Sequence, residues 1–195
     1  MARPRQVEDD EILSIARACF LEHGPGVSTT VIADAVGLSQ AALFKRFKTK
    51  KGLLFAALLP PEVPPFLSLI EAGPTDAPIE QQLRDIATAI SLFFQEVVPC
   101  MIALTGSGFD KDVIFDSFEV PPPVRTQQAL TGWFSRAMQA GQLRQVNPFD
   151  LAVSFQGALH VRAFMRHIGA PLAADPHDYV CTVVDTYLHG LEKTP

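Results

Sequence analysis

The chain has 195 residues and is 48% hydrophobic, so it is long enough for one domain of good size or for a small domain joined to a larger one. No uninterrupted apolar run reaches the roughly 18 residues of a membrane helix and no apolar signal segment begins the chain, so we expect a cytoplasmic protein without a membrane partner. The net charge of −5 argues against nucleic acid, but residues 1–59 carry +2 and residues 60–195 carry −7. This asymmetry suits a small nucleic-acid-binding domain on a larger part that does not bind.

A first helix is predicted to begin near Asp9 or Asp10, one of which is expected as its cap, after a short basic arm, and to end before Gly24-Pro25-Gly26. Its apolar residues recur at spacings of three and four, which is typical of one face of an amphipathic helix. They are Ile12, Ile15, Ala16, Cys19 and Phe20. We expect this helix to pack behind the two helices that follow it.

Residues 27–54 contain the strongest local pattern in the chain. Ser28 is a suitable N-cap for a short helix, and Gly37 supplies the positive φ that a tight turn needs. Leu38 is expected in the core, and Ser39 can cap a second helix over residues 40–47. Two short helices joined by a Gly-containing turn form a helix-turn-helix, whose second helix enters the major groove of DNA. The residues expected to face inward are Ile32, Ala33, Val36, Leu43 and Phe47, and those expected to face solvent on the second helix are Gln40, Ala41, Phe44 and Lys45.

A cluster of cations begins in the second helix and continues beyond it, with no acid among them. Its members are Lys45, Arg46, Lys48, Lys50 and Lys51. Thr49 can cap a further helix over residues 50–59, and the free N–H groups at its start would converge with the lysines on one phosphate. The segment therefore predicts contact with a nucleic-acid backbone.

The stretch resembles the TetR family of transcriptional regulators, whose pattern is T-x-x-x-I-A-x-x-x-G-V-S-x-x-x-L-Y-x-x-F-x-x-K-x-x-L. The residues that carry the resemblance are Ser28, Ile32, Ala33, Gly37, Leu38, Ser39, Leu43, Phe44, Phe47, Lys50 and Leu53. The chain departs from the family at Phe44, where Tyr is usual, at Arg46, where His is common, and at Ala41, where Gly is frequent. Phe44 lacks the hydroxyl that contacts a phosphate, and Arg46 is placed to supply a contact instead.

The resemblance implies an all-α protein, with a three-helix DNA-binding domain at residues 1–59 and a larger helical domain at 60–195 that binds a ligand and dimerises. Base edges are expected to meet Gln40, Ala42 and Lys45. The other residues expected on the DNA-binding surface, most of them at the backbone, are Ser28, Thr30, Ser39, Ala41, Phe44, Arg46, Lys48 and Lys50.

Prolines are predicted to break the helix that joins the two parts in this family. They are Pro60, Pro61, Pro64 and Pro65, and they leave a second helical piece at residues 66–72. The break is either a kinked strut between a ligand site and the DNA site or a stiff linker. Beyond Gly73-Pro74, a long helix is predicted from Ile79 to Pro99 and a short one at residues 100–104. The segment 105–123 is then predicted to be a long, functional or mobile loop.

Three helices are predicted after this loop. The first is amphipathic around residues 130–138, and the second begins at Asn147-Pro148, a good helix start, and runs to about Ile168. The second helix is apolar nearly all round, which indicates that it is covered on more than one side. The last helix is predicted from about Pro176 to Lys193.

The last two helices resemble the dimer interface of the family, in which two copies form a four-helix bundle. The interface residues expected on this basis are Leu151, Phe155, Leu159, Val180, Val184, Tyr187 and Leu188. The alternative is that both helices pack only on their own core. A homodimer is favoured, because a palindromic operator requires two DNA-binding domains.

Aromatic and methionine side chains of the larger domain could line an apolar cavity, with Gln156 or His160 as a polar anchor. This set comprises Phe93, Phe94, Met101, Trp133, Phe134, Met138 and Phe164. Close packing explains each of them singly without a ligand. For the domain as a whole, the family resemblance implies a pocket for a small apolar or aromatic effector.

No enzyme or metal signature emerges from the sequence. The histidines form no H-x-x-x-H pair, and there is no G-x-S-x-G elbow. The acids between Asp110 and Glu119 lack the glycine and the closing Glu of a calcium loop, so a solvated acidic loop is the better interpretation and no cofactor is expected. Cys19, Cys100 and Cys181 form an odd, unclustered set, which argues against a disulfide framework and against a zinc site. They are predicted to be buried, with a redox switch as the less favoured alternative.

The sequence therefore predicts a ligand-responsive DNA-binding regulator of transcription, with a repressor as the favoured form. It would bind a palindromic operator as a dimer and be released by the effector. The alternative is a small-molecule sensor or carrier that keeps the helix-turn-helix only as scaffold. The acidic larger domain and the missing Tyr hydroxyl support that alternative.

Overall fold

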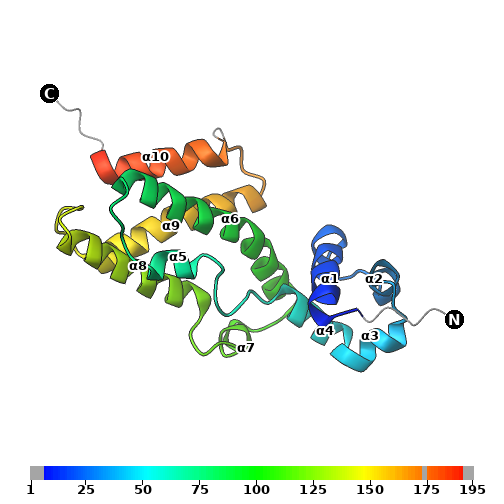
Figure 1. Ribbon diagram of the computed structural model, residues 1–195. Coiled ribbons are helices and arrows are strands. Elements are labelled where there is room, and N and C mark those ends of the chain that lie inside the picture. The colour runs from blue at the N-terminus through cyan, green and yellow to red at the C-terminus, as the bar shows by residue number, and fades with distance from the viewer. Residues whose placement is uncertain (1–6, 173–174, 191–195) are drawn as a thin grey trace. The chain divides into compact units, whose positions relative to one another are not determined.

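The computed structural model describes residues 7–172 and 175–190, which form ten α-helices and no strand (Figure 1). The predicted all-α class is confirmed. By its contacts the chain divides into two compact units. Unit 1 comprises Met1–Pro60 and Pro99–Ser117, and unit 2 comprises Pro61–Val98 and Phe118–Pro195. Segment 99–117, which the sequence analysis assigns to the larger domain, thus belongs to unit 1. The predicted basic arm at residues 1–6 lies outside the described part of the chain.

Hydroxyl caps start three of the first four helices, which are α1 (Asp9–His23), α2 (Thr29–Val36), α3 (Gln40–Phe47) and α4 (Lys50–Leu58). The side chains of Ser28, Ser39 and Thr49 accept hydrogen bonds from the first turns of α2, α3 and α4, as predicted. The predicted cap of α1 is wrong. Helix α1 begins after Glu8, which makes no side-chain cap, and Asp9 and Asp10 lie inside the first turn, where acids favour the helix dipole.

The core of unit 1 forms where the apolar faces of α1, α2, α3 and α4 meet. Arg17 Nε donates to the Ala57 carbonyl at 2.8 Å and ties α1 to α4. Gly37 adopts φ 77° and ψ 30°, the left-handed conformation that the turn between α2 and α3 requires. Leu38 and Phe47 are only half-buried, although both were expected inside. The fully buried side chains include Ile12, Ala16, Phe20, Ile32, Leu43, Leu53 and Leu58.

The segment after the proline break packs within unit 2. Helix α5 (Leu67–Glu71) forms the second helical piece that the sequence predicts. Phe66 meets Phe93 edge-on with ring centroids 5.3 Å apart. Gln142 Nε2 donates to the Thr75 carbonyl at 2.7 Å, and Arg136 donates to the Ile70 carbonyl at 3.3 Å. Residues 66–75 are therefore part of the folded unit and not a free linker.

Helix α6 (Ile79–Gly106) continues through Pro99, so the predicted end at Pro99 and the separate helix at residues 100–104 are wrong. Proline removes one hydrogen bond of the ladder but does not stop a helix whose apolar face remains buried on both sides of it. The boundary between the two units falls at this proline. Segment 105–123 is also more ordered than predicted, because it contains helix α7 (Lys111–Phe115), capped by Asp110.

Unit 2 also contains α8 (Pro122–Gln139), α9 (Pro148–His167) and α10 (Pro176–His189). Asn147 caps α9 as predicted. A chain of edge-on aromatic contacts joins the three helices, with successive ring centroids 5.5, 5.7 and 5.3 Å apart, through Trp133, Phe134, Phe155 and Tyr187. Helix α10 ends at His189, and residues 191–195, which include the predicted end, lie outside the described part.

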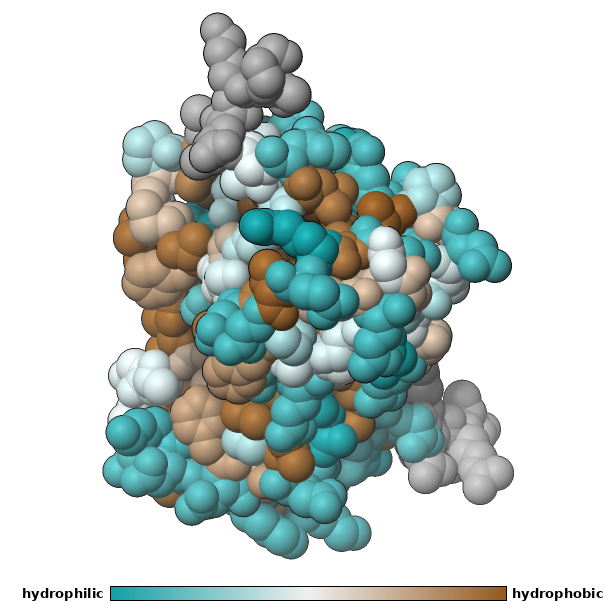
Figure 2. Space-filling view, turned by 90° about the vertical axis from the view of Figure 1, so that its left-hand side faces the viewer, coloured by the Kyte–Doolittle hydropathy of each residue, from teal (hydrophilic) through white to brown (hydrophobic). Residues whose placement is uncertain are grey.

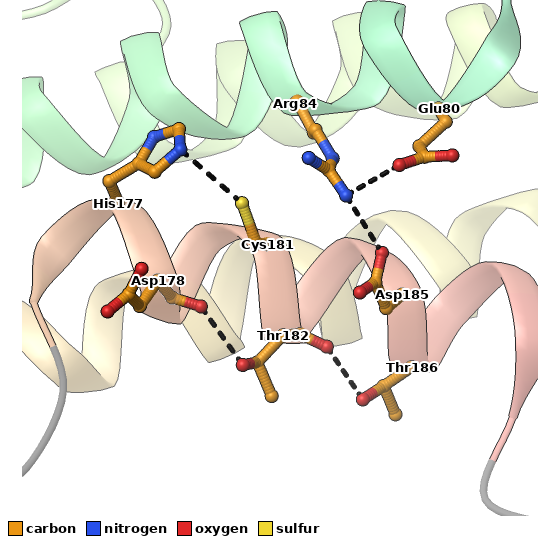
Figure 3. Close-up of polar contacts among 8 residues, drawn as sticks. All are labelled: Glu80, Arg84, His177, Asp178, Cys181, Thr182, Asp185 and Thr186. Atoms are coloured by element: carbon orange, nitrogen blue, oxygen red, sulfur yellow. Dashed lines mark hydrogen bonds and ion pairs between the residues drawn. The ribbon is translucent and has the colours of Figure 1, made fainter.

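Figure 3 shows polar contacts within α6 and within α10, and one ion pair, Arg84 with Asp185, that joins the two helices. Arg84 of α6 forms ion pairs with Glu80, at 2.5 Å, and with Asp185 of α10, at 3.2 Å. On the same side of α10, Cys181 Sγ lies 3.7 Å from Nε2 of His177. Cys19 and Cys100 are buried as predicted. Cys181 is half-exposed, because it lies on this polar side of α10 and not on the side that Val180 and Val184 bury in the core.

One described helix, α6, is long and apolar enough to cross a membrane by length and composition alone. A core helix of a soluble protein passes the same test, and α6 has a buried face that includes Leu83, Ile90 and Phe94. Elsewhere the surface is mixed, and Figure 2 shows hydrophobic residues lying among hydrophilic ones on the face that it presents.

Candidate nucleic-acid interface

Helix α3 presents a polar face to solvent because its apolar side packs on the core of unit 1. Leu43 is fully buried against the core of unit 1. Gln40, Ala41 and Lys45 are exposed, as predicted, whereas Phe44 is half-buried. The exposed face thus combines one amide, one small side chain and one cation, a set that can approach the edges of bases.

Gln40 is held by α2. Its Nε2 donates to the hydroxyl oxygens of Thr29, at 3.0 Å, and of Thr30, at 2.6 Å. The backbone N–H of Thr30 in turn donates to the Ser28 side chain at 3.1 Å. Thr29 is not among the site residues predicted from the sequence, because two residues 11 apart come into contact here only through the turn at Gly37.

Arg46 is occupied within unit 1. Its Nη1 donates to the Val7 carbonyl at 2.5 Å and to Asp9 Oδ1 at 2.8 Å, and so connects α3 to the start of α1. In this arrangement the guanidinium binds the protein and not a phosphate. Asp9 is mostly exposed, and exposed pairs of this kind contribute roughly 0–1 kcal/mol, so a phosphate could compete for Arg46.

A tight turn joins α3 to α4. Lys48 has φ 64° and ψ −54°, and the Thr49 N–H donates to the Phe47 carbonyl at 2.7 Å, which together describe a γ-turn. A Cβ at Gly52 would lie 2.6 Å from the Phe47 carbonyl oxygen, so the first turn of α4 accommodates only glycine in this geometry. Strained backbone of this kind is concentrated at functional sites, and here it falls at Lys48, between Lys45 of α3 and Lys50 of α4.

The cations of the predicted cluster differ in whether their side chains already contact other groups of the chain. Lys51 Nζ lies 4.7 Å from the centroid of the Phe109 ring, and Phe109 also packs on Phe55 at 5.0 Å. Lys48 Nζ donates to the Lys45 carbonyl at 3.2 Å. Within residues 7–172 and 175–190, the side-chain ammonium groups of Lys45 and Lys50 have no polar or ring partner. These two lysines are therefore the cations best placed to meet a phosphate at the start of α4.

The residues predicted to line a ligand pocket lie in different surroundings. Trp133, Phe134 and Met138 are buried in the packed core of unit 2, as are Phe93 and Phe94. By contrast, Phe164 is exposed, Gln156 donates to the Pro123 carbonyl at 3.2 Å, and Met101 falls in unit 1. The pocket stays a prediction.

His160 lies against Phe94, with ring centroids 5.1 Å apart. Partial burial there lowers the pKa of His160 below its usual 6.5. A groove of about 560 Å³ does open elsewhere on unit 2, and two of the predicted site residues, Leu151 and Tyr187, line it. Its lining is Leu143, Arg144, Val146, Asn147, Asp150, Leu151, Ser154, Thr186 and Tyr187. No group of side chains that could hold a metal ion occurs in the described part of the chain.

Helix α9 has two apolar faces. The predicted interface residues Phe155 and Leu159 lie on its inner face and are fully buried in the chain's own core, as are Val180 and Val184 of α10. These four side chains have little or no exposed surface to offer a partner, whereas Leu151, Tyr187 and Leu188 are half-buried. The outer face of α9 is exposed and carries Phe149, Val153, Gly157, His160, Val161, Phe164 and Ile168.

Residues 12–57 match the family model described as bacterial regulatory proteins, tetR family. A transcriptional regulator of the TetR/AcrR family from Thermobifida fusca has the same fold, at 18% identity and a TM-score of 0.68, over 95% of this chain and 100% of that one. FadR from Bacillus subtilis in complex with stearoyl-CoA is 13% identical, with a TM-score of 0.65 over 95% and 100% of the chains.

AibR in complex with isovaleryl coenzyme A and operator DNA is 21% identical, with a TM-score of 0.57, over 92% of this chain and 97% of that one. No curated protein matches the chain significantly in sequence. At these identities the structural likenesses establish the fold.

Proposed function

We propose that this protein is a dimeric, ligand-responsive repressor. The premise is that residues 12–57 match the tetR family model and that the chain has the fold of TetR-family regulators. The observation that carries the proposal is the helix-turn-helix itself. Helices α2 and α3 are joined at the left-handed Gly37, and the outer face of α3 is polar and exposed. Such a unit binds DNA with its second helix in the major groove.

In the proposed complex, Gln40, Ala42 and Lys45 meet base edges. The backbone would be held mainly by Lys50, beside the free N–H groups at the start of α4, and by Thr30 and Lys48. Ser28 and Ser39 contribute as helix caps, and Ala41 permits close approach. Phe44 makes at most apolar contact, and Arg46 reaches a phosphate only by leaving Asp9.

The outer face of α9 supports a homodimer. A monomer rarely leaves one whole helix face apolar and exposed, and Val153, Val161, Phe164 and Ile168 each keep more than two fifths of their surface exposed. A Cβ added at Gly157, in the middle of this face, would meet no atom of the same chain within 4 Å. We place the second copy here, related by a two-fold axis that also pairs two DNA-binding domains. The outer face of α10, with Asp178 and Thr182, is too polar to share the interface equally.

The proposed effector is a small molecule with an apolar part. FadR binds stearoyl-CoA and AibR binds isovaleryl coenzyme A, so acyl-CoA thioesters are the first class to test on this chain. An effector that binds the DNA-free conformation more tightly lowers operator affinity by the same factor by which DNA lowers effector affinity. Helix α6, with Pro99 at the boundary of the two units, is the element through which we expect this coupling to act.

The test is selection of binding sites from random duplex DNA by the purified full-length protein at physiological salt. A two-fold symmetric consensus supports a dimeric operator reader, and the recovered sequence then allows acyl-CoAs of different lengths to be tested as inducers. Recovery of nothing above background, from protein shown to be folded and dimeric and retested with these ligands, would favour a sensor or carrier that keeps its helix-turn-helix as scaffold. The engagement of Arg46 by Asp9 and the missing hydroxyl at Phe44 are the observations that favour this second function.

Gln40→Ala sharpens the same test. We expect a loss of roughly 1–3 kcal/mol of operator binding and relaxed preference at one base pair of each half-site. If affinity for every sequence fell equally, the base-reading role of Gln40 would be wrong.

A further inference from the structure

The Gln40 amide has limited freedom to contact a base, because α2 engages its amino group. Its Nε2 donates to Thr29 Oγ1 at 3.0 Å and to Thr30 Oγ1 at 2.6 Å. A glutamine amide has two N–H donors and one carbonyl acceptor. Both donors are used by these threonines, so Oε1 is the one group that Gln40 can offer to DNA.

The usual recognition of adenine by glutamine needs both ends of the amide. The carbonyl accepts from adenine N6 while an N–H donates to N7. With its amino group held by Thr29 and Thr30, Gln40 can make only the first of these bonds. A lone acceptor is satisfied by any exocyclic amino group in the major groove, which adenine presents as N6 and cytosine as N4.

Thr30 links this base contact to the backbone. Its hydroxyl oxygen accepts from Gln40, so its own O–H remains free to donate to a phosphate. The Ser28 side chain accepts from the Thr30 N–H and fixes the first turn of α2. One line of hydrogen bonds could therefore run from a phosphate through Thr30 and Gln40 to a base, and each bond would polarise the next.

We propose that Thr29 and Thr30 are specificity-determining residues, which restrict Gln40 to a single accepted hydrogen bond and so make it select adenine or cytosine on one strand without distinguishing them. This rests on the proposed function, and adds a residue, Thr29, that the family pattern of residues 28–53 does not single out. Removing the two hydroxyls frees the amide to rotate and to recognise adenine at both ends, so specificity at this base pair becomes narrower and not broader.

The experiment compares selected binding sites of four full-length proteins. Gln40→Ala identifies the base pair that Gln40 contacts. Wild-type protein is expected to recover adenine and cytosine at that position at comparable frequency. The double variant Thr29→Val/Thr30→Val, which keeps β-branched side chains of similar shape, is expected to favour adenine over cytosine by roughly tenfold, within the range of a bidentate contact. Thr29→Ser/Thr30→Ser retains both hydroxyls and is the matched control, with the wild-type preference.

Base preference is the readout because a loss of stability or of phosphate contacts weakens binding to all sequences alike. Guanine or thymine at the position in wild-type protein would overturn the inference, since these bases require a donor from Gln40. An unchanged adenine-to-cytosine ratio in the valine variant would also overturn it. If the double variant does not fold, Thr29→Val alone carries the same test. A wild-type protein that yields no symmetric consensus would instead refute the proposed function, and this inference with it.

Discussion

Unit 1 and unit 2 are both helical, but different interactions fix their helices. In unit 1, hydroxyl caps and tight turns set the ends of helices of 8 or 9 residues, at Ser28, Ser39 and Thr49. In unit 2, aromatic side chains join helices of 14 to 20 residues along their lengths, from Trp133 through Phe155 to Tyr187. Unit 1 therefore keeps a polar outer surface exposed on α3. Unit 2 instead leaves apolar side chains exposed on the outer face of α9, beyond those that its own core covers.

The largest expected effect separates the two faces of α9. Phe155 is fully buried on the inner face, so Phe155→Ala should lower the free energy of unfolding by roughly 3–5 kcal/mol. Val153, two residues earlier, is half-exposed on the outer face, and Val153→Ala should change stability by less than about 1 kcal/mol in dilute protein. The measurement is urea denaturation followed by the fluorescence of Trp133, the only tryptophan of the chain, which lies in the same aromatic contacts.

Protein concentration turns this pair into a test of the dimer. If a second copy covers the outer face, Val153→Ala should shift the monomer–dimer equilibrium toward monomer, as measured by analytical ultracentrifugation. Equal losses of stability from Phe155→Ala and Val153→Ala in dilute protein would show that the two faces of α9 are not distinct.

The next effect compares two glycines, one in each unit. A Cβ at Gly52 would lie 2.6 Å from the Phe47 carbonyl oxygen, so Gly52→Ala should destabilise the α3–α4 turn by roughly 1–3 kcal/mol. A Cβ at Gly157 would meet nothing within the chain, so Gly157→Ala should stabilise the monomer by roughly 0.5–1 kcal/mol, the usual gain inside a helix. Thermal unfolding by circular dichroism measures both changes, and a stabilising Gly52→Ala would contradict the turn geometry.

The sequence predicts unit 1 well because the signals there are local. Ser28, Gly37, Ser39 and Thr49 each act within a few residues of their own position, and each has the predicted role. The contacts that sequence reasoning missed are those between distant residues, such as Arg46 with Asp9 and Gln40 with Thr29. No spacing rule connects these pairs until the helices are packed.

Unit 2 is harder to predict because an apolar residue can face the core, a pocket or a partner with the same local pattern. The apolar character of α9 predicts cover on more than one side, but it does not say that Phe155 and Leu159 face the core while Val153 and Phe164 face outward. The predicted helix end at Pro99 is wrong for a related reason. The apolar side chains of α6 are buried on both sides of Pro99, and this burial outweighs one lost hydrogen bond.

A smaller effect tests which cations of unit 1 meet DNA. Lys50 has no partner in the described residues, whereas Lys51 lies over the Phe109 ring. Lys50→Ala should weaken binding to all sequences and reduce the slope of log affinity against log salt by about 0.9, the value for one phosphate contact. Lys51→Ala should leave that slope nearly unchanged. Fluorescence anisotropy with one operator duplex over a series of salt concentrations provides the measurement, and equal slopes for Lys50→Ala and wild type would exclude the phosphate contact.

The smallest effect is the dependence of unit 2 stability on pH through His160. Partial burial against Phe94 lowers the pKa of His160 below 6.5, so the unfolded chain takes up the proton at a higher pH than the folded one. Stability is therefore complete above about pH 6.5 and falls as the pH decreases from there toward the folded pKa. His160→Gln removes this loss, so the urea midpoint of the variant, followed by Trp133 fluorescence, should decline less than that of wild type between pH 7.5 and 5.5. Parallel declines would show that protonation of His160 costs no stability. Because His160 lies on the outer face of α9, cover by a second copy would bury it further and make the wild-type decline steeper at protein concentrations that favour the dimer.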